Sequence, residues 1–409
     1  MRRLAAESAR QPYLRLRPLV AAVGVAGALL LAGCGGTSQP APRPSTTGTS
    51  GQAASSSTSP HPIAGYFKPN DQKLSSCRGD RVCTEQAFGN IAYEQTPKTA
   101  LALVRRLYNT DAAVKSDCHR IVHTIGSAAL AKYHSVPIAF SKGDSTCWSG
   151  YYHGILERAF LKTTSTAGLA NVARGLCASP TIRRTTWLAY QCVHGLGHGL
   201  MIYTGYNLPF SLSICHRLAT AWDQTSCTGG VFMENINSSY GFHSQWLRKN
   251  DLVYPCEIVK RRDKLYCYLM VTSRILQANG YDWKGTARIC DRVERGWVST
   301  CFQSYGRDAS GFTRQSPVRI LHLCRIAGTA GRADCIYGAA RDLTANDTNG
   351  KRASQLCDAA PHDLRARCFS GIGTILAGFS STPAPTRAAC GSLSRVYVQA
   401  CLRGARLPS

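Results

Sequence analysis

Histidine and glutamate side chains recur at a spacing of four residues in three separate parts of the chain. The pairs are His119/His123, His153/Glu157 and His194/His198. On an α-helix this spacing places both side chains on one face about one turn apart, so each pair can bind one cation. Neutral imidazoles with one or two carboxylates suit Zn, Fe, Mn or Cu. The spacing therefore predicts helices that present ligands for a transition metal.

Two of these histidines hold equivalent positions relative to cysteines. His153 lies six residues after Cys147, and His198 lies six residues after Cys192. Equivalent positions in neighbouring repeat units face the same way when the units stack. We therefore expect the three helices, over 116–132, 144–160 and 186–203, to bring their polar pairs into one cluster.

The next unit supplies candidates that could complete the cluster. Met233 lies six residues after Cys227, and Glu234 follows it. A thioether ligand would favour Cu. The predicted metal ligands are His119, His123, His153, Glu157, His194, His198 and Glu234. They exceed one tetrahedral shell, so either two ions share the site or some of these groups orient ligands or act as acids and bases.

The function of this cluster stays open between two classes. Walker, GxSxG, HExxH, Rossmann and C-x-x-C patterns are all absent, so no familiar enzyme signature identifies a reaction. One class is a metal-dependent surface enzyme for hydrolysis or oxidation. The other is a binding protein or scaffold whose cluster sequesters or senses metal. A polar substrate pocket without metal, or histidines packed in the core, are the alternatives to metal binding.

The cysteines predict the architecture that positions these helices. The chain has 19 cysteines, and 18 remain if Cys34 carries lipid, an even number that favours disulfides. Five pairs have ten residues between their members, and their starts lie 33 or 34 residues apart. The predicted bridges are Cys77/Cys83, Cys118/Cys147, Cys177/Cys192, Cys215/Cys227, Cys256/Cys267, Cys290/Cys301, Cys324/Cys335, Cys357/Cys368 and Cys390/Cys401.

A period of this length accommodates two short helices and a turn. Glycine or serine often follows the second cysteine by three residues, where close approach of two helices needs a small side chain. The predicted fold is therefore all-α, built of disulfide-stapled helical-hairpin repeats in an α-solenoid-like array. The plan is similar to that of secreted, cysteine-stapled Sel1-like repeat proteins, although their cysteine spacing and glycine pattern are not reproduced.

The N-terminus has the features of an export signal. Five arginines precede an apolar run from Leu19 to Leu31, which is too short to span a bilayer. The following Leu31-Ala32-Gly33-Cys34 resembles the lipobox of bacterial lipoproteins. That resemblance implies cleavage before Cys34, lipidation of its side chain, and an extracytoplasmic protein anchored to the cell membrane.

Composition divides the rest of the chain. Residues 34–62 are rich in Ser, Thr, Pro and Gly with few large apolar side chains, which predicts a disordered tether. The predicted organisation is a signal peptide over 1–33, the tether over 34–62, an N-terminal helical cap over 63–115, His-rich stapled units over 116–250, and regular repeats over 251–409.

The net charge of +25 indicates which kinds of partner the protein can bind. With 44% hydrophobic residues, the chain is neither disordered nor collagen-like, and it is no multi-span membrane protein. An arginine-rich surface outside the cell suits acidic wall polymers or lipid headgroups. Nucleic acid is not expected, because basic motifs interleaved with aromatic residues and zinc-finger spacings are both missing.

Overall fold

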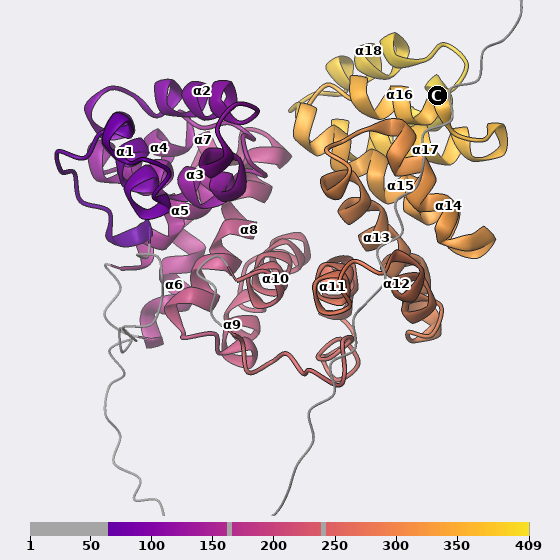
Figure 1. Ribbon diagram of the computed structural model, residues 1–409, viewed down its shortest axis with the longest axis horizontal. Helices are drawn as coiled ribbons and strands as arrows, with labels where there is room; N and C mark the ends of the chain where they lie inside the picture. The colour runs from indigo at the N-terminus through magenta and orange to yellow at the C-terminus, as the bar shows by residue number, and fades with distance from the viewer. Residues whose placement is uncertain (1–63, 162–165, 239–242, 409) are drawn as a thin grey trace, which may run out of the picture. The chain divides into compact units, whose positions relative to one another are not determined.

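The computed structural model describes residues 64–161, 166–238 and 243–408 (Figure 1). Within these ranges the chain forms nineteen α-helices and three short 3-10 helices, η1 (Ala64–Tyr66), η2 (Leu74–Ser76) and η3 (Arg295–Trp297), and no strand. The predicted all-α fold is confirmed. In the same ranges no helix is both long and apolar enough to cross a bilayer. The predictions for residues 1–62, including lipidation of Cys34, lie outside the described residues.

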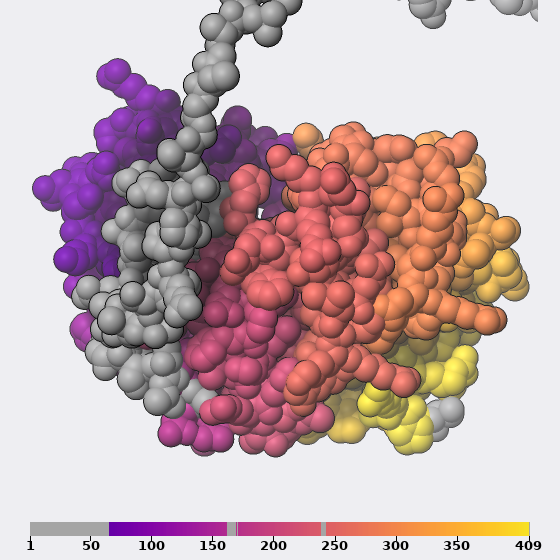
Figure 2. Space-filling view, turned by 90° about the horizontal axis from the view of Figure 1, so that it is seen from below, coloured from indigo at the N-terminus to yellow at the C-terminus, as the bar shows by residue number. Residues whose placement is uncertain are grey.

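Ten helices pack against one another in chain order and form what we call the core row. They are α1 (Arg81–Glu94), α3 (Ala112–Tyr133), α5 (Gly150–Phe160), α8 (Thr186–Tyr203), α10 (Ala221–Ile236), α11 (Lys264–Ala278), α13 (Val298–Phe312), α15 (Gly328–Asp347), α17 (His362–Leu376) and α19 (Val398–Gly404). Their buried apolar side chains form one continuous hydrophobic cluster. In the space-filling view the colours run in order from magenta to yellow across the face, as expected of units packed in chain order (Figure 2).

The other nine helices flank the row. They are α2 (Pro97–Leu107), α4 (Val136–Phe140), α6 (Thr166–Leu176), α7 (Pro180–Arg183), α9 (Leu208–Cys215), α12 (Trp283–Cys290), α14 (Pro317–Ile326), α16 (Lys351–Ala359) and α18 (Pro383–Leu393). Six of them have proline in the first turn. Proline suits this position because its fixed φ is already helical and its missing N–H would have no partner there. Proline therefore marks the start of six of the nine flanking helices.

Eight of the nine disulfides join a core-row helix to the segment that precedes it, and Cys118–Cys147 joins α3 to the turn before α5. The bonded pairs are those predicted from the cysteine spacing: Cys77–Cys83, Cys118–Cys147, Cys177–Cys192, Cys215–Cys227, Cys256–Cys267, Cys290–Cys301, Cys324–Cys335, Cys357–Cys368 and Cys390–Cys401. Disulfides in this number are typical of proteins that fold in an oxidising compartment outside the cytoplasm.

Glycine lets neighbouring core-row helices approach closely around the histidines. A Cβ atom at Gly154 of α5 would lie 1.8 Å from the carbonyl oxygen of His123, and one at Gly126 of α3 would lie 1.9 Å from that of Tyr151. These distances are far below van der Waals contact, so only glycine fits at either position. The two glycines therefore set the register of α3 on α5, and with it the positions of the histidines.

Helix α5 begins later than the sequence predicts. The helix was expected over 144–160 but starts at Gly150. Three successive residues, Cys147, Trp148 and Ser149, have φ between 52° and 63°. This left-handed backbone is incompatible with a right-handed helix, so the disulfide at Cys147 closes a turn and not a helical segment.

Distant parts of the row also meet. The rings of Trp187, at the start of α8, and Phe379, after α17, have centroids 4.6 Å apart. The backbone N–H of Trp187 donates to the carbonyl oxygen of Gly378 at 2.7 Å. Since residues almost 200 positions apart are in contact, the row bends back on itself, and helices from α5 to α17 line a shared interior cavity.

Candidate metal centre

Five histidines from three successive core-row helices meet in one buried cluster. His119 and His123 lie on α3, His153 on α5, and His194 and His198 on α8. All are buried except His119, which is half-buried. The ring of His153 is central, because its centroid lies between 4.2 and 5.7 Å from those of the other four rings. The cluster predicted from the four-residue spacing is therefore present.

The cluster divides into two groups of three that share one member. The groups are His119, His123 and His153, and His153, His194 and His198. Within each group one ring nitrogen per residue lies within 4.8 Å of the others. Nitrogens that bind one tetrahedral ion at 2.0–2.1 Å lie about 3.4 Å apart, so small side-chain rotations would bring each group to metal-binding geometry. Each group could hold an ion.

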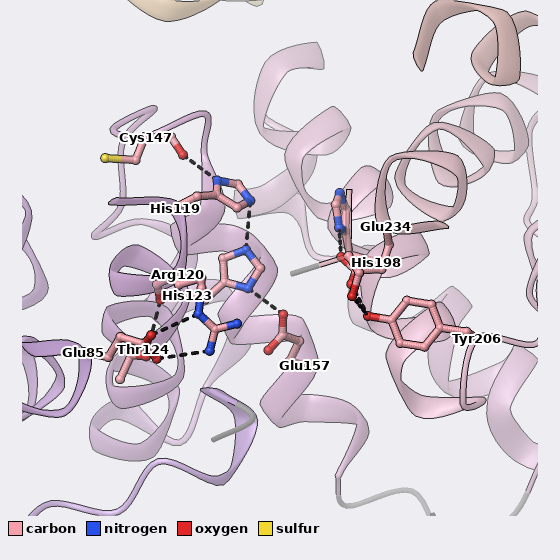
Figure 3. A network of polar contacts seen from close by, with 11 residues as sticks. Glu85, His119, Arg120, His123, Thr124, Cys147, Glu157, His198, Tyr206 and Glu234 are labelled. Carbon is pink, nitrogen blue, oxygen red and sulfur yellow. Dashed lines mark hydrogen bonds and ion pairs between the residues drawn. The ribbon is translucent and has the colours of Figure 1, made fainter. Parts of the chain in front are cut away.

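Hydrogen bonds orient the two α3 imidazoles (Figure 3). His119 Nδ1 donates to the carbonyl oxygen of Cys147 at 2.7 Å, and His123 Nδ1 donates to Glu157 Oε1 at 2.6 Å. With Nδ1 used in this way, the Nε2 atoms face each other at 3.1 Å. A hydrogen bond at Nδ1 leaves Nε2 as the basic atom that binds metal. This pair is therefore already close to the separation required by one ion.

The α8 side repeats the arrangement with a second carboxylate. His198 Nδ1 donates to Glu234 Oε2 at 2.9 Å, and Glu234 Oε1 accepts a hydrogen bond from the hydroxyl of Tyr206 at 2.6 Å (Figure 3). His198 Nε2 is buried and has no hydrogen-bond partner. His194 Nε2 lies 3.4 Å from the sulfur of Met233. His198 Nε2 and His194 Nε2 are the two atoms on α8 that a second ion would use.

His153 differs from the other members of the cluster. Its side chain is 1% exposed, and neither Nδ1 nor Nε2 has a hydrogen-bond partner. Leaving a buried polar group unsatisfied costs about 1–3 kcal/mol, and most native proteins avoid it. A group that binds ions at both nitrogens would remove this cost.

Burial keeps four of the five imidazoles neutral. Burial, and next the adjacent His123, lower the pKa of His119 to about 3, while burial and then His198 lower that of His123 to about 3. The same causes lower the pKa of His153 and His194 well below the ordinary value. Neutral imidazole is the form that binds one metal ion, so these four histidines offer ligands to one ion each without prior loss of protons. A ring that binds an ion at each nitrogen must in addition lose its N–H proton and become an imidazolate.

A cavity of about 320 Å³ gives access to the cluster. His153, His194 and Met233 form part of its lining, and the charged residues around it are Arg307, Arg341 and Asp342. Tyr190 also lines it and stacks on His194, with ring centroids 5.0 Å apart. A small molecule in this cavity could therefore reach the side of the cluster formed by α5 and α8.

The two predicted glutamates lie behind the imidazoles. Glu157 was expected to act together with His153 of its own helix, whereas its Oε1 accepts a hydrogen bond from His123 of the neighbouring helix. Glu234 contacts His198 in the same way. Tyr206 and Arg341 were not predicted, because neither residue is placed by the cysteine repeat or by a four-residue spacing.

Comparison of the chain with protein-family models, curated proteins and solved structures finds no match.

Proposed function

We propose that this protein is a membrane-anchored extracytoplasmic lipoprotein that binds two transition-metal ions, with His153 as a ligand shared between them. One observation carries the proposal: His153 belongs to both groups of three histidines, and both of its buried ring nitrogens are without a hydrogen bond. Each ion would take two Nε2 atoms from one neighbouring helix and one nitrogen from His153. The repeat thus supplies one histidine pair for each ion, and His153 would be a ligand of both ions.

The carboxylates support this arrangement. A shared His153 would bind as an imidazolate with one negative charge, and the other four imidazoles are neutral ligands, so most of the charge of two ions stays uncompensated in a buried site. Glu157 and Glu234 each accept a hydrogen bond from a ligand imidazole, at 2.6 and 2.9 Å. Such pairs fix the ring orientation and increase the basicity of the metal-binding nitrogen. One carboxylate would serve each ion.

The cavity favours catalysis over simple storage. A storage site is closed by protein ligands, whereas a catalytic site keeps a position for water or substrate. Here the three-histidine groups leave a fourth position, and His153 and His194 line the cavity. When bound, the ions would supply Lewis acidity or redox chemistry for hydrolysis or oxidation of a small molecule. The residues of the chain bind the ions, orient the imidazoles and shield the site from bulk solvent.

Elemental analysis of protein purified from its native extracytoplasmic compartment tests the proposal. We expect about two equivalents of Zn, Fe, Mn or Cu per chain in the wild type. His153→Ala should lower this to one equivalent or less, because both ions lose a ligand. His322→Gln, outside the cluster, is the control and should keep both. Background metal in the wild type would reject metal binding and leave a stapled binding scaffold as the better function, whereas one ion in both wild type and His153→Ala would reject the shared ligand alone.

A further inference from the structure

A second hollow, of about 880 Å³, lies far along the chain from the histidine cluster. Its walls come from the end of α13, the length of α14, the beginning of α15 and the turn between α16 and α17. Helix α14 packs against both α15 and α16, which fixes these walls relative to one another. We call this hollow the arginine groove.

The arginine groove is strongly basic. Its charged and titratable lining residues are Arg319, Arg325, Arg332, Arg365, His322 and His362, and no carboxylate is among the residues that line it. Four guanidinium groups that line one groove repel one another. Such an arrangement lowers the stability of the protein unless an anion enters, so its presence indicates a binding site.

None of the four arginines forms an ion pair within the part of the chain that the structure describes. Arg319 donates to the carbonyl oxygen of Thr313 at 2.7 Å, and Arg365 Nε donates to that of Ala360 at 2.9 Å. A guanidinium carries five N–H donors, so most of their donors stay available.

Arg332 gives the most specific indication. Its Nε is buried and has no hydrogen-bond partner. The N-terminus of α17 also meets the groove, since Pro361 and His362 line it. The N–H groups of a first turn and the positive end of the helix dipole favour anions at such a terminus, and Asp363 in the first turn of α17 offsets part of this attraction. The buried Nε–H of Arg332 and the backbone N–H groups at the start of α17 thus offer hydrogen-bond donors to an anion, in addition to the positive charge of the arginine side chains.

We propose that the arginine groove binds an anionic ligand with at least two linked phosphate groups. Guanidinium groups match the oxygens of phosphate in a two-point geometry, which lysine cannot reproduce. One phosphate would occupy only a small part of 880 Å³, so a ligand with two linked phosphates fills more of the groove and offers oxygens to more of its arginines. Exposed Phe312 and Val318 lie at the same groove and could contact the apolar portion of a larger phosphate-bearing molecule. This proposal does not depend on metal binding.

Pyrophosphate is the probe for the test, used with the full chain in detergent and measured by isothermal titration calorimetry. The exposed Arg319 and Arg325 are suitable for substitution, because replacing them should not disturb the core. We expect Arg319→Gln and Arg325→Gln each to weaken pyrophosphate binding about tenfold. Arg395→Gln, exposed and outside the groove, should leave the affinity unchanged.

Three further measurements decide the proposal. Inorganic phosphate should bind at least tenfold more weakly than pyrophosphate, and equal affinity would overturn the requirement for two phosphates. Binding of pyrophosphate should persist in His153→Ala, which separates the groove from the metal site; its loss there would overturn the assignment to the groove. If the protein ignores pyrophosphate and binds only vesicles that contain phosphatidylglycerol, the groove is a membrane-contact surface and the proposal is wrong.

Discussion

His123 Nδ1 and Glu157 Oε1 lie 2.6 Å apart across the interface between α3 and α5. Both side chains are 1% exposed, so this hydrogen bond is shielded from water and from salt. The contact links the first histidine pair to the helix that carries His153. One buried carboxylate thereby holds two helices of the site in a defined relation.

Glu157→Gln should weaken metal binding about 10- to 100-fold, because the neutral amide is a poorer acceptor for the imidazole N–H and reduces the basicity of His123 Nε2. Competition with a chelator of known affinity measures this effect. The exposed Glu257 provides a matched control, and Glu257→Gln should leave the affinity unchanged. Equal affinities of wild type and Glu157→Gln would show that the carboxylate has no role in the site.

The sequence predicted the fold because covalent bonds and local periodicity determine it. Nine bridges, five of them with the same spacing, leave few ways to arrange the helices, and two histidines four residues apart lie on one face of any helix. The sequence could not identify the acceptor of each histidine, because that depends on how far one helix is shifted along the next. The shift is set by the contact of Gly154 with the backbone at His123, which no local pattern encodes.

Arg341 and Tyr206 also could not be predicted from local sequence patterns. Arg341 lies far along the chain from His194, yet both line one cavity because the row bends back. Tyr206 follows the end of α8 and reaches Glu234 through a loop. Contacts of this kind arise from tertiary curvature and loop paths, and neither has a periodic signature in sequence.

Met233→Leu should distinguish the metals. The sulfur of Met233 lies 3.4 Å from His194 Nε2, so a thioether ligand is available only to the ion on the α8 side. Thioethers favour Cu(I), and leucine preserves the packing volume without the donor. We expect about tenfold weaker Cu(I) binding and an unchanged Zn(II) affinity. Met270→Leu, in the same cavity, is the control, and an equal loss in both variants would indicate a packing effect.

Gly154→Ala should destabilise the protein by roughly 1–3 kcal/mol, because the added Cβ would lie 1.8 Å from the carbonyl oxygen of His123 and force α3 and α5 apart. Urea denaturation measures the change. Gly391→Ala, in α18, meets nothing within 4 Å and should be neutral or stabilising by about 0.5–1 kcal/mol through helix propensity. Similar stabilities of the two variants would contradict the close approach.

Cys34→Ala should release the protein from the membrane into the medium, since the lipid on this cysteine would be its main hydrophobic attachment. Fractionation of cells that express each form, followed by immunoblotting, measures the distribution. Thr37→Ala, three residues later, should remain with the membrane. Retention of Cys34→Ala at high salt would contradict lipid anchoring, whereas release by salt alone would indicate attachment through positive charge.

The last prediction concerns acid. An isolated imidazole has a pKa near 6.5, so an ordinary histidine site loses metal as protons compete below that pH. Here burial, and then the neighbouring imidazoles, lower the pKa of His119 and His123 to about 3. Protons should therefore compete little for these two ligands between pH 7 and 5. The proton that a shared His153 loses on binding should then be the main source of pH dependence, at most about tenfold per pH unit for the two ions together.

The same shift has the opposite consequence for the stability of the metal-free protein. Below pH 6.5 the unfolded chain takes up protons at these histidines while the native state does not, so their contribution to the free energy of unfolding decreases as the pH falls toward about 3. Chelator competition at pH 7.0, 6.0 and 5.0, with circular dichroism to verify the fold, separates the two effects. A loss of affinity much steeper than about tenfold per pH unit while the fold is intact would show that several imidazoles titrate normally, as they would in a site open to water.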